Sequence, residues 1–253
     1  MRMRATRSIL ALIAVLWMTL VQAETVTVAA EDDWAPYSSA KPDRSGPMGV
    51  SPELVKAAFK TQGIDVRFVV LPFSRCLHYA ESGTVVGCFN TSRTDNNKDA
   101  FLWHPTPLFQ EELAIFARAD APDRVLTRED LRGHSVGVTV GYTYPSDVMN
   151  DPRITRLSAS SDSNLLKMLV AGRVNYILLN TMPGYYRLKH EPALAGKVKR
   201  VGRISMDSFW LSFSKTHPDG QRLCDAFEKG LKAIKANGQY DSMMASFRRD
   251  LQP

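Results

Sequence analysis

Residues 85–107, VVGCFNTSRTDNNKDAFLWHPTP, are the stretch of this 253-residue chain that decides the fold. They begin as a short apolar run and turn directly into small polar side chains at residues 90–94. The pattern predicts a buried strand that ends in amides and hydroxyls. Open α/β folds place ligands at the carboxyl ends of such strands, so the stretch favours a binding site. A strand followed by an ordinary polar loop is the alternative that the pattern leaves open.

Similar strand ends recur along the chain. Residues 25–30 alternate as a strand, and Ser51 and Pro52 are expected to begin a helix that Gly63 ends. A second series predicts a strand at 135–140, a helix at 164–171 capped by residues 161–163, and a strand at 174–179. Residues 197–214 are expected to form two short strands, followed by helices at 220–236 and about 240–249. Two α/β lobes fit this order, and the polar strand ends at 90–94, 141–143 and 180–181 would face one another across a cleft.

The first 23 residues have the features of a secretory signal. Three arginines precede the apolar run 8–21, which is too short to span a bilayer, and Val21-Gln22-Ala23 supplies small residues at the cleavage site. We expect cleavage after Ala23 and export to the periplasm; an uncleaved membrane anchor is the alternative. Removal of this segment lowers the formal charge from +6 to +3.

The composition argues against several classes of protein. The remaining arginines are scattered among acids and prolines rather than between aromatic residues, so nucleic-acid binding is not expected. The five histidines are far apart and no CxxC is present, so neither a metal site nor a cofactor is expected. In an oxidising compartment, Cys76 and Cys88 could form a disulfide because they lie on adjacent predicted elements, whereas Cys224 is expected to be a buried thiol.

Several phrases together resemble the periplasmic solute-binding proteins of the polar amino-acid type, the bacterial extracellular family 3. The phrases are WAPY (34–37), GPMGVSPELVKAAFKTQG (46–63), LPFSRCLHYAESGTVVG (71–87), the SRT and F-x-W-x-P block (92–105), LRGHSVGVTVGYTY (131–144), LLKMLVAGRVNYILLN (165–180) and KAIKANGQYDSMMASF (232–247). They cover essentially the whole predicted mature chain in the family's order.

The resemblance implies a two-lobed α/β clamshell of type II, each lobe a mixed sheet flanked by helices. Residues 24–115 and 206–253 would form lobe 1, and residues 116–205 would form lobe 2. Such proteins close around a small ligand by hinge rotation and present it to a membrane partner. For this chain the resemblance implies a monomer that binds a small polar solute, amino-acid-like or a small carboxylate, for an ABC transporter permease.

Two positions depart from the family's pattern. Thr94 matches the threonine of a Thr-x-x-Arg motif, but Asn97 stands where the family has the arginine that takes an α-carboxylate. Asn180 stands where the family has an aspartate that pairs with the α-ammonium, and Asn175 replaces an aspartate earlier in the same strand. Both ionic contacts to a zwitterion are therefore missing at these positions, which argues against a standard α-amino acid.

The remaining candidates for ligand contact come from both lobes. The resemblance and the strand-end pattern together single out Trp34, Tyr37, Asn90, Ser92, Thr94, Tyr142, Thr143 and Asn180. Arg75, at a predicted helix start, could hold a carboxylate bidentately or could form a surface salt bridge. Arg93 could likewise enter the cleft or point away from it.

Two other functions remain open from the sequence. The chain could be a ligand-sensing module without a cognate transporter, since both functions use the same cleft. It could also be a dehydratase-like enzyme, as some relatives of the family are. The acids and bases nearest to the predicted cleft are Glu31, Asp32, Asp33, His78 and Glu81. Caps and surface side chains explain them as well, and we expect no catalytic residue and no enzyme activity.

Overall fold

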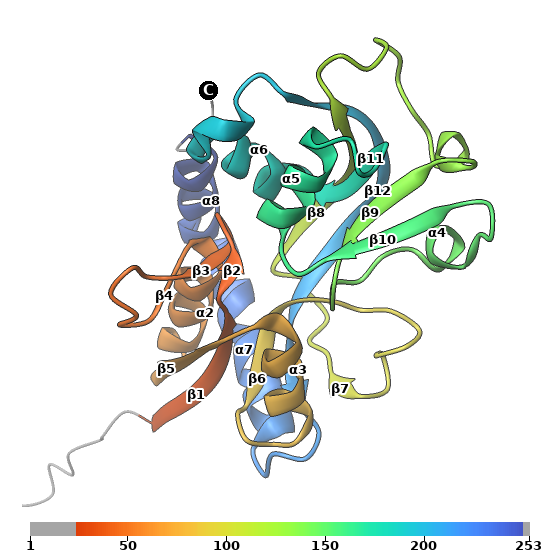
Figure 1. Ribbon diagram of the computed structural model, residues 1–253. Helices are drawn as coiled ribbons and strands as arrows, with labels where there is room; N and C mark the ends of the chain where they lie inside the picture. Colours follow the sequence, from red (N-terminus) through yellow and green to blue (C-terminus); the bar gives the residue numbers. More distant parts are fainter. Residues whose placement is uncertain (1–23, 250–253) are drawn as a thin grey trace, which may run out of the picture.

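A computed structural model describes residues 24–249, which form a mixed sheet with helices packed on it (Figure 1). The predicted signal sequence and its cleavage site after Ala23 lie outside the described residues. Within the described residues, nine strands form one curled sheet, in the order β10-β9-β11-β8-β12-β6-β1-β5 with β7 paired to β12. A small second sheet has the order β2-β3-β4.

Lobe 1 is built from both ends of the described chain. Its strands are β1 (Glu24–Glu31), β2 (Asp33–Trp34), β3 (Ser38–Ala40), β4 (Pro47–Met48), β5 (Ile64–Leu71), β6 (Gly87–Ser92) and β7 (Phe101–Leu102). Its helices are α2 (Val50–Lys60), α3 (Phe73–Glu81), α7 (Gly220–Ala236) and α8 (Gln239–Arg249). Strand β1 pairs in parallel with both β5 and β6, so the carboxyl ends of these strands meet at one edge of the sheet.

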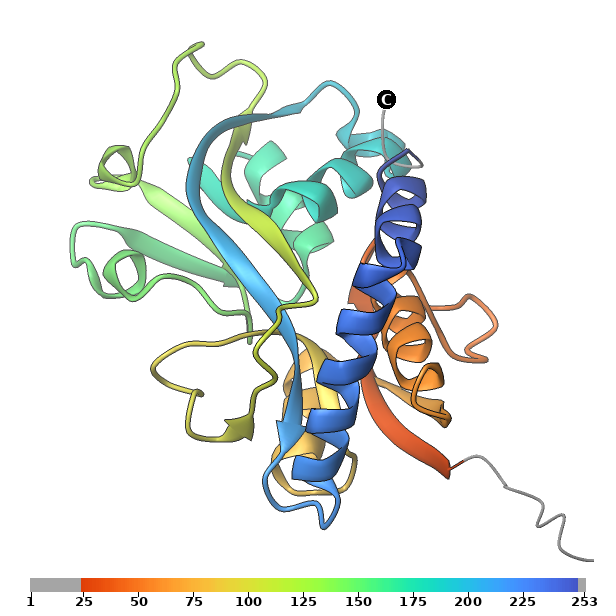
Figure 2. The same ribbon diagram turned by 180° about the vertical axis from the view of Figure 1, so that it is seen from behind.

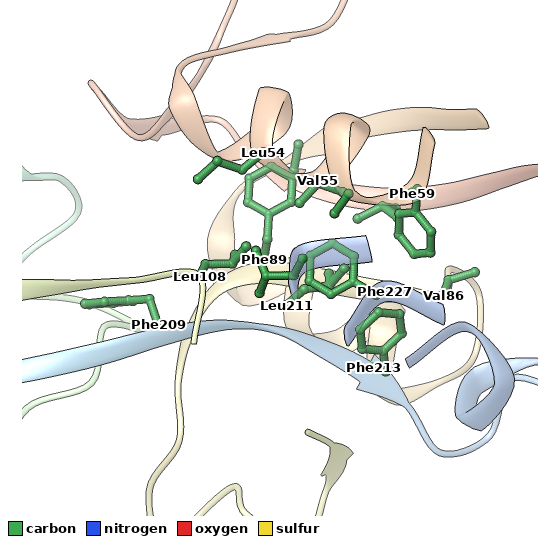
Figure 3. Close-up of a cluster of buried hydrophobic side chains, with 14 of the residues drawn as sticks. Leu54, Val55, Phe59, Val86, Phe89, Leu108, Phe209, Leu211, Phe213 and Phe227 are labelled. Atoms are coloured by element: carbon green, nitrogen blue, oxygen red, sulfur yellow. The ribbon is translucent and has the colours of Figure 1, made fainter. Parts of the chain in front are cut away.

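The core of lobe 1 forms where helices α2 and α7 pack together against the sheet. Phe59 of α2, Phe213 of the sheet and Phe227 of α7 are fully buried, and their rings lie 5.1–6.3 Å apart (Figure 3). Gly230 allows the two helices to approach closely, because a Cβ at this position would lie 2.1 Å from the carbonyl oxygen of Ala58.

Lobe 2 is formed by the middle of the chain, between the two long strands that connect the lobes. Its elements are η1 (Glu129–Leu131), β9 (Ser135–Thr139), α4 (Ser146–Asn150), β10 (Thr155–Ala159), α5 (Asp162–Val170), β11 (Tyr176–Asn180), α6 (Thr181–His190) and η2 (Pro192–Leu194). Alternate residues of β11 enter two separate hydrophobic clusters, Leu178 on one face of the sheet and Ile177 and Leu179 on the other. The hydrophobic core of lobe 2 is thus distinct from that of lobe 1.

Two long strands, β8 (Phe109–Arg118) and β12 (Val198–Ser214), run through both lobes (Figure 2). They pair antiparallel from Val198 opposite Arg118 to Phe209 opposite Phe109. The expectation of two short strands at 197–214 is wrong, since β12 is a single strand whose register shifts twice. The predicted lobe boundaries at residues 115 and 206 fall inside these two strands.

The remaining predictions on the fold concern the cysteines and the membrane. Cys76 of α3 and Cys88 of β6 form a disulfide with their Cα atoms 5.6 Å apart. Cys224 is a buried free thiol on α7. In residues 24–249, no helix combines the length and the apolar character that crossing a bilayer requires.

Candidate functional site

A small cavity of about 30 Å³ lies between the two lobes. Lobe 1 and the nearby end of β12 contribute Glu31, Trp34, Phe73, Asn90, Ser92, Asp207 and Phe209. The shared strand β8 contributes Leu113, and lobe 2 contributes Tyr142, Thr143, Tyr144, Asp162, Leu178, Leu179 and Asn180. The polar strand ends that the sequence singled out, at residues 90, 142–143 and 180, therefore do meet across one cavity. This volume is far below that of ordinary ligand pockets, so the lobes have to separate further to admit a solute.

Not all predicted residues line this cavity. It is lined by Trp34, Asn90, Ser92, Tyr142, Thr143 and Asn180. Tyr37 is buried behind Trp34, with the two ring centroids 4.7 Å apart, and its hydroxyl donates to Glu111 at 2.5 Å. Thr94 lies in an adjoining groove that also includes Ser92 and Thr143.

The candidate cations lie outside the cavity. Arg75 is exposed on α3 and does not line it. Arg93 is exposed, with its guanidinium 5.9 Å from the ring centroid of Trp103, and lines only the adjoining groove. Asn97, at the family's arginine position, is held in its own turn: it accepts from the Thr94 amide at 2.7 Å and donates to the Ser92 carbonyl at 2.8 Å.

Asn90 is the most constrained polar side chain of the cavity. It lies within the buried part of β6 in a left-handed conformation, with φ at 63°, and is 3% exposed. Its Oδ1 accepts a hydrogen bond of 2.6 Å from the Ser51 hydroxyl, which fixes the orientation of the amide. Its Nδ2 is buried and has no hydrogen-bond partner among the described residues. A buried donor in this position is available to an acceptor on a ligand.

Asp162 is a site residue that the sequence reasoning missed, because it was read only as a helix cap. Ser161 is the residue that caps α5, its hydroxyl accepting from the Asn164 amide. Asp162 instead turns inward: it is 2% exposed and lines the cavity. Its carboxyl group accepts a hydrogen bond of 2.6 Å from the Thr139 hydroxyl. Burial raises the pKa of Asp162 to about 6.

Glu31 and Asp207 add two further carboxyl groups to the cavity lining. Glu31 ends β1 and is buried, and burial raises its pKa well above the usual range; the nearby charge of Asp162 raises it further, whereas a hydrogen bond with Tyr142 lowers it. Burial also raises the pKa of Asp207. Glu31 stands at a strand end and was among the acids that the sequence placed near the cleft, whereas Asp207 lies inside β12, where no strand end marks it.

The cavity is acidic. None of the described residues that line it is a lysine, an arginine or a histidine. Arg187 of α6 is a nearby cation, since its charge lowers the pKa of Asp162, but it forms ion pairs with Asp33 and Glu191. The site therefore combines hydrogen-bond donors with three carboxyl groups, and its described lining residues supply no counter-charge for an anion.

The acids and bases considered for catalysis are dispersed. Glu31 lines the cavity, whereas Asp33 is bound to Arg187, and His78 and Glu81 are exposed on α3. Asp32 is partly buried at the end of β1, and burial raises its pKa. Within residues 24–249, no group of three or more His, Cys, Asp or Glu side chains could hold a metal ion.

Comparison with known proteins assigns the family. A model of the bacterial extracellular solute-binding proteins, family 3, matches residues 26–249, nearly the whole described chain. The chain belongs to this family. Family 3 proteins are exported, which places the protein in the periplasm or outside the cell. The family confirms the resemblance drawn from the sequence, and its members are binding proteins rather than enzymes.

Individual relatives of this family 3 protein are distant. The ABC transporter arginine-binding protein 1 of Escherichia coli (strain K12) is 25% identical over 139 residues, 54% of this chain and 56% of that protein. The match thus spans little more than half of the relative's own length.

Two solved structures have the same two-lobed fold as this family 3 protein. A histidine kinase sensor domain with similarity to periplasmic binding proteins has a TM-score of 0.78 at 24% identity, over 88% of this chain and 95% of that one. An ancestral arginine-binding protein bound to arginine has a TM-score of 0.76 at 23% identity, over 88% of this chain and 97% of that one. At these identities the likeness concerns the fold alone.

Proposed function

We propose that this family 3 protein binds one small polar solute in the cavity between its lobes and delivers it to an ABC transporter permease. The observation that carries the proposal is the cavity itself, because polar side chains from both lobes converge on one small enclosed space. The name of the E. coli relative, an ABC transporter binding protein, supports the transport role.

Closure of the lobes would bring the two halves of the site together. In this proposal, residues 24–115 and 206–253 move against residues 116–205 by bending β8 and β12, the strands common to both. Trp34 and Asn90 would hold the solute from lobe 1, and Tyr142, Asp162 and Asn180 from lobe 2. Tyr37 would support Trp34 from behind rather than contact the solute.

The proposal also concerns the cellular setting. The protein would be cleaved after Ala23 and act in the periplasm as a monomer that meets the permease in its closed form. It would release its solute chemically unchanged, because the family consists of binding proteins and the acids considered for catalysis do not converge.

Native mass spectrometry of protein isolated from the periplasm of producing cells tests solute binding without assuming a ligand class. We expect a stoichiometric small molecule that is lost on unfolding, raises the melting temperature when added back, and is recovered unaltered. The Trp34→Ala variant should lose the molecule, whereas an alanine variant of Trp103, whose indole donates to the Lys98 carbonyl, should keep it. Equal occupancy in both variants would contradict the proposed site.

A sensing role is the second candidate, favoured by the likeness to a histidine kinase sensor domain. The two roles differ in the partner of the closed protein. Photocrosslinking of solute-loaded protein in the periplasm should yield a transporter permease under the main proposal, and a receptor under the alternative.

A further inference from the structure

We propose that the solute is a small organic cation that carries no carboxylate and offers a neutral hydrogen-bond acceptor, such as an amino alcohol or an amino amide. This inference rests on the proposed function and names the ligand class of the same cavity. Three independent features of the lining carry it: the charges, one buried donor, and the aromatic wall.

The charges of the cavity suit a cation. Glu31, Asp162 and Asp207 enter it from three different elements, β1, α5 and β12. The charge of Asp162 raises the pKa of Glu31, so these two carboxyl groups share one electrostatic environment. An ammonium group placed between them would relieve their mutual repulsion and gain charge-assisted hydrogen bonds.

The same charges disfavour a carboxylate on the ligand. A buried carboxylate needs a counter-charge, and the described lining residues include no basic side chain. The nearby cations do not line the cavity: Arg187 pairs with Asp33 and Glu191, and Arg75 is exposed on α3. Arg93 is exposed and lines only the adjoining groove. The site would therefore stabilise the ammonium group of an α-amino acid and repel its carboxylate.

The buried amide of Asn90 adds a requirement for an acceptor. Its Oδ1 accepts a hydrogen bond of 2.6 Å from the Ser51 hydroxyl. Its Nδ2 is also buried, but it has no hydrogen-bond partner among the described residues. Leaving such a buried donor unpaired is destabilising, because it has lost its hydrogen bonds to water. A hydroxyl, ether or amide oxygen on the cation would satisfy Asn90 without adding negative charge to the acidic cavity.

Aromatic rings complete the site. Trp34 and Phe209 lie with their ring centroids 5.0 Å apart, and Phe73 lines the same cavity. Tyr37 stacks behind Trp34 and fixes the indole plane. Aromatic faces attract organic cations, and they also exclude water from the carboxyl groups, which strengthens the electrostatic selection.

Matched pairs of ligands test the inference, each pair differing only in the carboxylate. Calorimetric titration would compare ethanolamine with serine, 4-aminobutanamide with glutamine, cadaverine with lysine, and agmatine with arginine. We expect each amine to bind at least tenfold more tightly than its amino acid. Ethanolamine and 4-aminobutanamide should bind more tightly than amines without a hydrogen-bond acceptor. The Asn90→Ala variant should lose this difference in affinity.

Charge variants identify the anion that selects the cation. Asp162→Asn keeps the shape of the side chain and its acceptor for the Thr139 hydroxyl, so the variant should remain folded while amine affinity falls at least tenfold. If this variant is unstable, Asp207→Asn is the second test. Asp120→Asn, an exposed acid outside the cavity, is the matched control and should bind amines as the parent does.

Tighter binding of any amino acid than of its amine, or binding of acetate or succinate in the cavity, would overturn the inference and leave solute binding intact. Failure of all four amines would overturn it as well. Solute binding itself is tested separately by the molecule that co-purifies, so the two failures are distinguishable.

Discussion

At the scale of single residues, the site depends on carboxyl groups whose burial could not be read from the sequence. Asp162 lies between two serines at a helix start, where an aspartate is ordinarily a cap. Only the packing of α5 against β9 turns it towards Thr139 and into the cavity. Local sequence shows where polar residues occur, whereas the inward or outward direction of a side chain is set by tertiary contacts.

Asp162 should make stability depend on pH. Because its folded pKa is about 6 and its unfolded pKa is near 3.8, the folded state holds the proton more tightly. Its stabilising contribution is fully present below about pH 4 and is lost as the pH rises through 6. Two pKa units correspond to about 3 kcal/mol at most. Urea unfolding of parent and Asp162→Asn between pH 4 and 7.5 measures the difference.

The variant isolates this carboxyl from the others that titrate in the same range. Relative to the parent, the free energy of unfolding of Asp162→Asn should increase as the pH rises from 4 to 7. Thr139, Tyr144, Arg187, Asp33 and Glu31 face or influence Asp162 and are unchanged in both proteins. A difference that is constant across this range would show that Asp162 does not titrate as the buried geometry requires.

Elsewhere at this scale, the sequence singled out several residues that the fold brings to one cavity. Asn90, Tyr142 and Asn180 were predicted from polar strand ends, and all three line one cavity. Arg75 illustrates the limit of such reasoning. Its helix start was recognised, but the rotation of α3 exposes the guanidinium, and helix rotation depends on which face packs, here the face with Cys76 and Ala80.

At the scale of elements, close packing between helices α2 and α7 explains Gly230. Gly230→Ala should destabilise the protein by about 2 kcal/mol, because the new Cβ would lie 2.1 Å from the carbonyl oxygen of Ala58 and force α2 and α7 apart. Chemical unfolding measures the effect. Lys229→Ala, at the exposed neighbouring position on α7, is the control. Equal stability of the two variants would contradict the close contact between the helices.

Strand β12 shows why element boundaries are harder to predict than elements. The sequence predicted two short strands within residues 197–214. In the structure, the strand continues through register shifts near Gly202 and Ser205 because β8 pairs along its length. Similarly, Ser51 was expected to cap α2, but the helix begins at Val50 and the Ser51 hydroxyl binds Asn90. Both outcomes depend on partners distant in sequence.

At the scale of the whole molecule, ionic and hydrogen-bonded contacts join the two lobes. Arg187 of α6 pairs with Asp33 of β2. Glu111 of β8 accepts from the Tyr37 hydroxyl at 2.5 Å and from the Met182 amide at 2.8 Å, and burial raises the pKa of Glu111 to about 7. These contacts stabilise the arrangement in which the cavity is enclosed.

Loss of the Arg187 contact should weaken solute binding without unfolding the protein. Arg187→Ala removes an attraction that favours the enclosed arrangement, so the affinity for the preferred amine should fall by up to about tenfold, since partly exposed ion pairs contribute about 1 kcal/mol. Calorimetric titration measures the change. Arg132→Ala, which removes a pair with Asp151 inside lobe 2, should bind as the parent does. Equal losses in both variants would exclude a specific role for the contact between the lobes.

A crystal structure of the protein with its co-purified solute tests the central claim most directly. We predict one small molecule between Trp34 and Asp162, with a positively charged nitrogen within hydrogen-bond distance of the Asp162 carboxyl and an acceptor on Asn90 Nδ2. A solute bound elsewhere on the protein would contradict the cavity between the lobes as the binding site. A solute whose carboxylate occupies this cavity would contradict the selection of cations.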